Sequence, residues 1–279
     1  MVNFTIDEFR VNPSRFTLLQ HVLGSAFQFS VDVAGRLVVQ RLLNNAAYLE
    51  LALFLMEIVP HLLILAGHPN GNHVLQAFIL ACNSPALVDS ITFFLRPYIP
   101  FLSCHYFGRH VIEKLIDHIS QEMLCLLVND LSGYVLSLSL SEIGSNVIQA
   151  MIRNCDHRPS LAILVSQIIP HVQIVASNPY GNYVLQDAIR RVNDEVLGNL
   201  ISRLMDQGTL LVLLQGEYAH VYRCLVDSCD VTQLRVIVQE LRMFLIVHGV
   251  ILRQSESGVL VIRRVRCLIR VGQARLFHM

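Results

Sequence analysis

Residues 178–186 read Asn-Pro-Tyr-Gly-Asn-Tyr-Val-Leu-Gln, and residues 69–76 read Pro-Asn-Gly-Asn-His-Val-Leu-Gln. Both contain a hexapeptide that begins with glycine, and the pattern recurs along the chain with leading glycines at 35, 71, 108, 144 and 181. The steps between these glycines are 36, 37, 36 and 37 residues. A fixed period of this size indicates stacked supersecondary units, each too small to bury its own apolar face.

Two weaker copies extend the array. Residues 218–223 (Tyr-Ala-His-Val-Tyr-Arg) follow 37 residues after Gly181, and residues 258–263 (Gly-Val-Leu-Val-Ile-Arg) follow 40 residues later. The sequence therefore predicts one continuous repeat domain over residues 1–279. Its seven repeats lie at approximately 10–45, 46–82, 83–118, 119–155, 156–192, 193–232 and 233–270.

The composition supplies a large core and argues against intrinsic disorder. Hydrophobic residues make up 53% of the chain and charged residues 15%, with a formal net charge of zero. A chain this apolar can bury enough surface to fold. Neutral charge counts against a strongly electrostatic nucleic-acid binder, because phosphate contacts come from surplus Lys and Arg. A local stripe of basic residues is still compatible with a net charge of zero.

Residues 48–67 resemble a membrane span in hydropathy, but Glu50, Glu57, Pro60 and His61 interrupt them. Ionisable groups are costly in a bilayer, so the sequence predicts two core helices joined near Pro60 and no membrane association. The seven cysteines include no Cys-x-x-Cys pair. We therefore expect reduced, mostly buried thiols, no metal site, and a cytoplasmic or nuclear protein, with the cytoplasm preferred.

The fifth copy defines the repeat most clearly. Residues 160–169 predict a buried helix that ends at Pro170, followed by a short segment at 171–176. A second helix is expected from about Asn182 to Val192. Within it, Val184, Leu185, Ala188 and Ile189 have the spacing of one buried face. The same spacing predicts that residues 74, 75, 78 and 79 are buried in the second copy, and residues 147, 148, 151 and 152 in the fourth. The predicted fold class is all-α.

Each second helix is expected to expose a triplet at positions i, i+1 and i+4, which neighbour one another on a helix surface. An outer pair of amides that flanks a flat ring suits an unpaired base, because amides can bond its Watson–Crick edge while the ring stacks on its face. The triplets are Arg36/Leu37/Gln40, Asn72/His73/Gln76, Arg109/His110/Glu113, Ser145/Asn146/Gln149, Asn182/Tyr183/Gln186, Ala219/His220/Arg223 and Val259/Leu260/Arg263.

These motifs resemble Pumilio (PUF) repeats, over roughly residues 10–270 and most strongly up to residue 193. The resemblance implies a right-handed superhelix, a crescent of stacked helical repeats, whose concave face binds single-stranded RNA with one base per repeat and the two chains antiparallel. By similarity, Asn182/Gln186 and Asn72/Gln76 would read uracil, and Ser145/Gln149 would read adenine. Repeats five to two would then favour 5′-U-A-N-U-3′, with Arg109/Glu113 fitting no usual pair.

The chain also departs from that family's pattern. The family typically has eight repeats and seven are found here, Leu37 could stack only weakly, and Ala219, Val259 and Leu260 cannot hydrogen-bond to a base edge. A short or loosely specified target is therefore expected. The RNA-binding residues predicted in this way are Arg36, Gln40, Asn72, His73, Gln76, Arg109, His110, Glu113, Ser145, Asn146, Gln149, Asn182, Tyr183, Gln186, His220 and Arg223.

Several plainer interpretations stay open beside these. Arg109 and Glu113 could form an ordinary i, i+4 salt bridge. His220 could be a simple surface histidine, and Arg223 and Arg263 could contact phosphates or only solubilise the surface. The motif glycine permits either a close approach or a positive φ.

Catalytic motifs and phosphate-cradling loops are missing from the sequence, so neither an enzyme nor a cofactor is expected. The first functional hypothesis is a monomeric regulator of mRNA that binds 3′ untranslated regions and recruits protein co-regulators. The second is a helical scaffold that has lost RNA binding and contacts proteins. The third is a nucleolar relative that acts in ribosomal RNA maturation.

Overall fold

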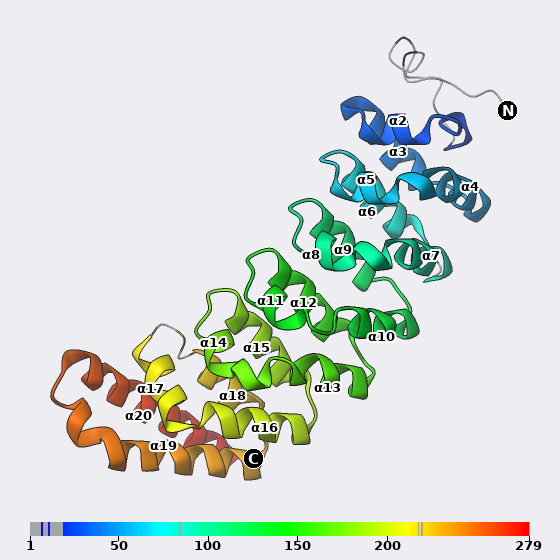
Figure 1. Ribbon diagram of the computed structural model, residues 1–279. Coiled ribbons are helices and arrows are strands. Elements are labelled where there is room, and N and C mark those ends of the chain that lie inside the picture. The colour runs from blue at the N-terminus through cyan, green and yellow to red at the C-terminus, as the bar shows by residue number, and fades with distance from the viewer. Residues whose placement is uncertain are drawn as a thin grey trace. The chain divides into compact units, whose positions relative to one another are not determined.

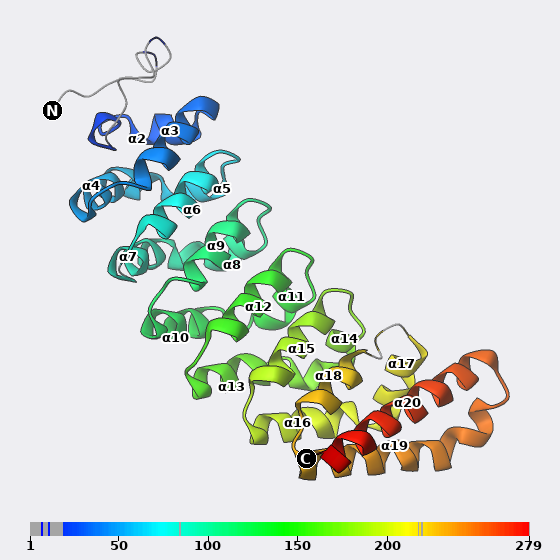
Figure 2. The same ribbon diagram turned by 180° about the vertical axis from the view of Figure 1, so that it is seen from behind.

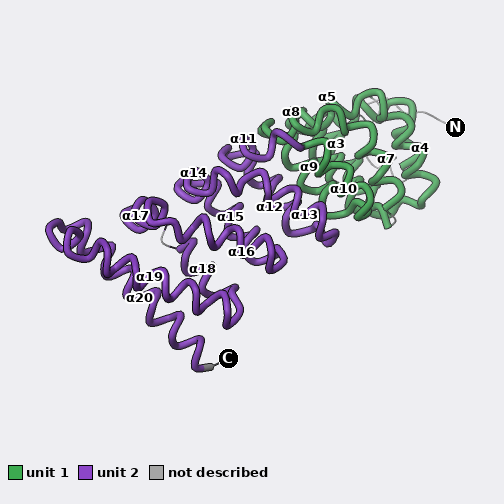
Figure 3. The backbone as a smooth tube through the Cα atoms, turned by 60° about the horizontal axis from the view of Figure 1, so that its bottom comes forward, with its two compact units in different colours: residues 1–131 green, residues 132–279 purple. Residues whose placement is uncertain are grey.

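The computed structural model describes residues 7, 11, 19–83, 85–216, 218 and 220–278, and over these residues it contains helices and no strand. The predicted all-α repeat solenoid is confirmed. The chain forms two compact units, residues 1–131 and 132–279 (Figure 3). The single domain with seven repeats stays a prediction, and residues 10 and 12–18 of its first repeat lie outside the described residues.

The fifth repeat shows how the sequence builds one layer. It consists of α13 (Arg158–Ser166), the 3₁₀ turn η5 (Ile169–His171), α14 (Val172–Ala176) and α15 (Gly181–Arg191) (Figure 1). Pro170 lies within the 3₁₀ turn, where its missing N–H removes a helical hydrogen bond, and so the chain changes direction there. The predicted elements are confirmed, although the helix before Pro170 ends earlier than expected, at Ser166.

Unit 1 repeats this plan. Its second helices α3 (Val33–Leu43), α6 (Gly71–Ala81) and α9 (Gly108–Ile116) contact one another in chain order. The remaining elements are η2 (Leu19–His21), α2 (Ala26–Val31), α4 (Tyr48–Ile58), η3 (Val59–His61), α5 (Leu62–Gly67), α7 (Pro85–Leu95), η4 (Arg96–Tyr98), α8 (Ile99–Ser103) and α10 (Gln121–Asp130).

Unit 2 begins with α11 (Val135–Ser139) and α12 (Gly144–Asn154) and continues through the fifth repeat. Helices α12, α15, α18 and α20 contact one another in succession (Figure 2). The elements after the fifth repeat are α16 (Asp194–Leu204), α17 (Gln207–Gln215), α18 (His220–Ser228), α19 (Val231–Leu252) and α20 (Glu256–His278).

The motif glycines allow a close approach between backbones. A Cβ atom built on Gly71 would lie 2.8 Å from the carbonyl oxygen of Leu65, and one on Gly181 would lie 2.7 Å from that of Val175. Positive φ occurs, among the described residues, only at Gly24 and Gly133. Close packing of the short helix beneath the second helix therefore explains these glycines, not an unusual backbone conformation.

The last layer differs from the others. Helix α19 runs without a break through the region where the other repeats turn. The apolar side chains of Ile246 and Val250 consequently lie in solvent, with 71% of each exposed. Helix α20 packs back along α19 as the second helix of this layer (Figure 2).

The core predicted from helical spacing is confirmed. The four predicted apolar positions of the second, fourth and fifth second helices are all buried. Two stretches, Tyr48–Gly67 and Arg158–Ala176, are long and apolar enough to cross a membrane, but each is broken by a 3₁₀ turn and packs within its layer. Absence of membrane association stays a prediction.

The prediction of mostly buried thiols is wrong, although none of the cysteines forms a disulfide among the described residues. Cys155, Cys224 and Cys229 are buried, while Cys104 and Cys267 are exposed. Cys104 follows the end of α8, and Cys267 lies on the solvent side of α20, where burial is not available. Burial raises the pKa of Cys229 to about 12, which keeps that thiol protonated at neutral pH.

Candidate nucleic-acid interface

The predicted triplets lie on helices that neighbour one another within each unit: α3, α6 and α9 in unit 1, and α12, α15, α18 and α20 in unit 2. Their third members Gln40, Gln76, Glu113, Gln149 and Gln186 are half-buried, and Arg223 and Arg263 are exposed. Because these residues occupy equivalent positions on adjacent helices, they form a row of polar groups along each unit.

The prediction that all three members of a triplet face outward is wrong for the first member. Asn72 is 1% exposed, Asn182 is 2% exposed and Ser145 is 3% exposed. Arg36 and Arg109, which occupy the same position, are half-buried. The first member lies against the turn that leads into its helix, where backbone carbonyl oxygens, one of which also accepts a helical N–H bond, are within reach of its side chain.

Asn72 bonds to these carbonyl oxygens through its own amide. Its Nδ2 donates to the carbonyl oxygens of His68 at 2.7 Å and Pro69 at 3.0 Å. Its Oδ1 accepts a 2.9 Å hydrogen bond from Nε2 of Gln76. Both N–H groups of Asn72 are therefore used within the repeat, whereas Oε1 and the second N–H of Gln76 make no hydrogen bond to the described residues.

Asn182 reproduces this arrangement in unit 2. Its Nδ2 donates to Asn178 and Pro179 carbonyls, each at 2.9 Å, and its Oδ1 accepts from Gln186 Nε2 at 3.2 Å. His220 of the next repeat adds a 2.8 Å bond from Nε2 to the same Oδ1. The buried asparagine thus fixes the glutamine and also joins two successive second helices.

The fourth repeat achieves a similar orientation with a serine. Gln149 Nε2 donates to the backbone carbonyl of Ser145 at 3.2 Å, and Ser145 Oγ bonds back to the Glu142 carbonyl at 3.4 Å. The glutamine is oriented by the backbone here, not by a neighbouring amide. Asn146, the middle member, is half-buried and reaches the Glu142 carbonyl at 3.4 Å.

The middle members place flat rings along parts of both rows. Tyr183 is 56% exposed, and its ring stacks against that of His220 with centroids 6.4 Å apart and planes inclined by 30°. In unit 1, His73 is exposed and His110 is half-buried. Partial burial and the charge of Arg36 lower the pKa of His73, which favours the neutral form of this ring. Leu37, exposed by 57%, offers an aliphatic surface instead.

Polar members of the unit 1 triplets contact each other or the backbone. Arg109 Nη1 and Glu113 Oε1 lie 4.0 Å apart, so the salt bridge that the sequence left open is present at the limit of contact distance. Gln40 donates to the backbone carbonyl of His73 at 3.2 Å, which links the first two second helices. Burial, Arg109 and His73 together lower the pKa of His110.

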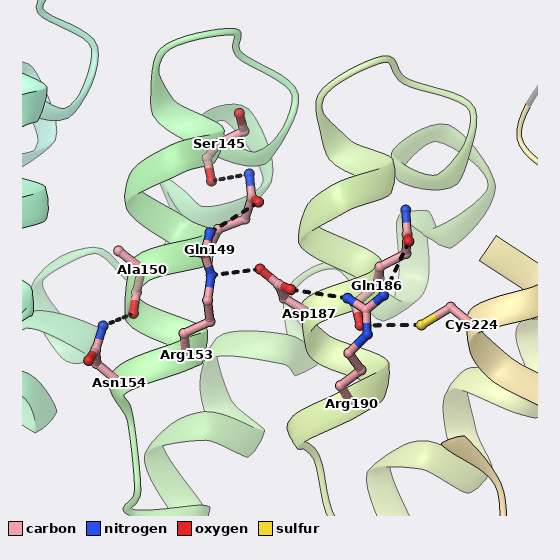
Figure 4. A network of polar contacts seen from close by, with 9 residues as sticks. All are labelled: Ser145, Gln149, Ala150, Arg153, Asn154, Gln186, Asp187, Arg190 and Cys224. Atoms are coloured by element: carbon pink, nitrogen blue, oxygen red, sulfur yellow. Dashed lines mark hydrogen bonds and ion pairs between the residues drawn. The ribbon is translucent and has the colours of Figure 1, made fainter. Parts of the chain in front are cut away.

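Sequence reasoning missed a network one turn beyond the triplets of unit 2 (Figure 4). Arg153 of α12 and Arg190 of α15 both contact the carboxylate of Asp187, at 2.9 Å and 3.3 Å. Arg153 also donates to Oε1 of Gln149 at 3.3 Å, and Arg190 to Oε1 of Gln186 at 3.5 Å. Gln149 and Gln186 are therefore each held from both sides. The signal was an arginine nine residues after Gly144 and Gly181.

A second group that sequence reasoning missed caps the second helices. The residue three positions before each motif glycine accepts hydrogen bonds from backbone N–H groups at the helix start. His68 Nδ1 accepts from Gly71 at 3.2 Å, and Asn178 Oδ1 accepts from Gly181 at 2.8 Å. Asp32, His105, Ser141 and Ser255 act in the same way. Alignment of the repeats shows an acceptor at each of these positions.

The sixth and seventh triplets are less complete. Ala219 lies outside the described residues, and Arg223 is exposed and pairs with Asp227 at 2.9 Å. On α20, Val259 is half-buried and Leu260 is 42% exposed. Arg223 and Arg263 thus take the place of the glutamine, and Val259 and Leu260 replace the asparagine and the tyrosine in the seventh triplet, while the sixth keeps a ring in His220.

Comparison with known families and proteins fits this arrangement. Residues 127–268 match the family model described as a NOP9-like PUF repeat domain. Residues 61–88 and 98–132 match the model of the Pumilio-family RNA binding repeat.

Among curated relatives, Pumilio domain-containing protein C6G9.14 of Schizosaccharomyces pombe is 26% identical over 251 residues, which cover 76% of this chain and 36% of the relative. Suppressor protein MPT5 of Saccharomyces cerevisiae is 21% identical over 54% of this chain and 18% of its own length. The chain thus spans about a third or less of these two relatives.

Solved structures support the fold. The Puf3 RNA binding domain bound to the Cox17 RNA 3′ UTR recognition sequence site A superposes with a TM-score of 0.75 and 20% identity, over 94% of this chain and 78% of that one. The RNA-binding domain of yeast Puf5p bound to AAT2 RNA has a TM-score of 0.75 and 16% identity, over 90% and 75% of the two chains.

Proposed function

We propose that this chain, which belongs to the Pumilio (PUF) family of helical repeat proteins, binds single-stranded RNA through its triplet rows, with one base at each complete triplet. The observation that carries the proposal is the held glutamine: Gln76, Gln149 and Gln186 each have their amide oriented by hydrogen bonds from within their own repeat. A preoriented amide binds a base edge with less loss of side-chain entropy than a mobile one.

The expected preference follows from the third members and their neighbours. Gln186 beside Tyr183 and Gln76 beside His73 would each read uracil, and Gln149 in the Ser145 repeat would read adenine, which gives a 5′-U-A-N-U-3′ core. The buried first members act as positioning residues that set the geometry of these amides. Protein recruitment to bound mRNA in the cytoplasm, by a monomer without catalytic activity, completes the proposal.

A second candidate is protein scaffolding without RNA binding. The exposed apolar face of α19, which includes Ile246 and Val250, favours it, since large exposed apolar side chains that cluster on a helix mark contact surfaces. Ribosomal RNA maturation remains a further alternative for the RNA that is bound.

Selection of bound RNA from a random pool tests the proposal, and a U-A-N-U core is the expected result. The change Gln186→Ala should then weaken binding to the selected RNA by about 1–3 kcal/mol, the range of a lost base-edge contact. Gln239→Ala, which removes an exposed amide from α19, is the matched control and should leave binding unchanged. Enrichment of no sequence, together with equal binding by both variants, would favour the scaffold.

The double change Asn182→Ser with Gln186→Glu tests the assignment of one base to one repeat. By family resemblance, this pair should move the preference at a single position of the selected RNA from uracil to guanine. Retained uracil at that position would show that the fifth repeat has been assigned to the wrong base.

A further inference from the structure

The positive charge of this chain is concentrated on its last helix. Helix α20 carries five arginines against one acidic residue, Glu256. Because the whole chain has 21 basic and 21 acidic residues, the other residues together carry a net charge of −4 and α20 carries +4. The chain is therefore neutral overall although its last helix is strongly basic.

Two of these arginines stabilise the packing of α20. Arg264 donates to the carbonyl oxygens of Leu214 and Gly216, and Arg275 donates to that of Val226. Both side chains are half-buried. They attach α20 to the ends of α17 and α18, so they are not available to a ligand.

The other three, Arg263, Arg266 and Arg270, are exposed, and no ion pair joins them to any described residue. Their spacing of three and four residues places them on one side of the helix. At a rise of 1.5 Å per residue they extend over about 10 Å. We call these three residues the α20 arginine stripe.

Comparison with the other repeats explains why the stripe is open to solvent. The eighth residue after the motif glycine is apolar and buried in the other described second helices: Leu43, Ile79, Ile116, Ile152 and Ile189, and Val226 at the equivalent place in α18. In α20 this position is Arg266, and it is exposed. The position that is buried in the other repeats therefore presents a guanidinium to solvent in α20.

The stripe is also continuous with the triplet row of unit 2. Arg263 is the third member of the last triplet, so it follows Gln149, Gln186 and Arg223 on successive contacting helices. Beside Arg263, a depression lined by Arg253, Glu256 and Leu260 opens at the start of α20. Val259 and Leu260 provide no group for a base edge, but the arginines provide donors for phosphate oxygens.

We infer that the α20 arginine stripe binds the phosphate backbone of single-stranded RNA without regard to sequence, and so continues on α20 the strand that the complete triplets read. This inference rests on the proposed function. RNA and an anionic membrane would both complement this charge, but RNA is favoured because the apolar face of α20, including Val261, Val265 and Leu268, is buried in packing and cannot enter lipid.

The test compares two triple variants that lose the same charge. Arg263→Gln, Arg266→Gln and Arg270→Gln remove the stripe, while Arg203→Gln, Arg235→Gln and Arg242→Gln remove three exposed arginines from α16 and α19. Fluorescence anisotropy measures the affinity for a 20-nucleotide RNA with a U-A-N-U core, and for oligo-C of equal length, between 50 and 200 mM salt.

Each phosphate contact on a single strand contributes about 0.7 to the slope of log affinity against log salt. Loss of the stripe should reduce that slope by about 2 for both RNAs, so the fourfold rise in salt costs the variant roughly 15-fold less affinity than it costs the wild type. The matched control should keep the wild-type slope. Equal slopes in the two triple variants would overturn the inference, since net charge alone would then explain binding.

The outcome also separates the inference from the proposed function. A stripe variant that retains its preference for U-A-N-U over oligo-C, with a smaller slope, supports both. A wild-type protein with no base preference contradicts the proposed function, while the slope comparison still tests the stripe. Arginine-dependent binding to phosphatidylserine vesicles but not to RNA would overturn the inference. If the triple variant melts early, Arg266→Gln alone should lower the slope by about 0.7.

Discussion

The second repeat in unit 1 and the fifth repeat in unit 2 have nearly the same motif but different surroundings. Asn72/Gln76 and Asn182/Gln186 form the same hydrogen bonds inside their repeats. Gln186 is also contacted by Arg190, whereas the equivalent of Arg190 in the second repeat is the exposed Leu80. The motif thus fixes the orientation of the amide, and residues one turn later set the charge beside it.

The largest expected effect tests what the two repeats share. Gly181→Ala and Gly71→Ala each force a Cβ against a backbone carbonyl at 2.7 Å and 2.8 Å, and should lower the free energy of unfolding by about 1–3 kcal/mol. Gly198→Ala on α16 meets nothing within 4 Å and should instead raise it by about 0.5–1 kcal/mol. Urea unfolding measures all three. A loss of stability in only one of the two motif variants would contradict the conclusion that both glycines serve the same close packing.

An intermediate effect tests what the two repeats do not share. Arg190→Leu should weaken RNA binding about fivefold, because it removes ~1 kcal/mol of exposed charge interaction. Leu80→Arg should strengthen binding by a similar factor, because it gives the second repeat the arginine of the fifth. Titration of both variants with the same U-A-N-U RNA checks this. The two changes in affinity must have opposite signs. A gain in affinity from both changes would show that the arginine does not contact RNA.

The smallest effect concerns pH and belongs to unit 1. The pKa of His73 and that of His110 are both lowered in the folded state, mainly by burial, so the unfolded chain binds more protons in acid. The contribution of these two histidines to stability should therefore be fully present above pH 6.5, the ordinary histidine value, and should fall as the pH drops from there toward the lowered pKa values.

Urea unfolding at pH 7 and pH 5.5 measures this effect. The variant His73→Gln with His110→Gln should lose less stability between the two pH values than the wild-type protein. An identical loss in both would assign the pH dependence to other groups.

The sequence was sufficient to predict the fold because each layer repeats its signals. Glycine spacing, the apolar positions of the second helices and Pro170 each predicted elements that the structure contains. It did not predict the burial of Asn72 and Asn182, because spacing alone cannot tell a polar side chain that faces solvent from one that satisfies nearby carbonyls. The Asp187 network was missed for a related reason, since Arg153 and Asp187 lie 34 residues apart and meet only when the layers stack.

The continuous α19 shows a different limit. Its apolar pattern resembles that of the earlier first helices, and proline does not mark the difference, because the fourth and sixth repeats turn without one. The predicted bounds of the seventh repeat, 233–270, stay a prediction, while the first helix of the last layer is unbroken in the structure. The assignment of particular residues to RNA contacts stays a prediction, and the variants above test it.

The buried asparagines have a consequence for redesign of this protein. A side chain that closes the turn of its own repeat cannot be exchanged freely, because a replacement at position 72 or 182 loses the amide that donates to two carbonyl groups. A serine, as at Ser145, supplies a donor to one carbonyl. The glutamines four residues later make no hydrogen bond to the carbonyl groups of the turn. Altered specificity should therefore be easiest to engineer at the glutamines, with asparagine, or serine as at Ser145, retained beneath them.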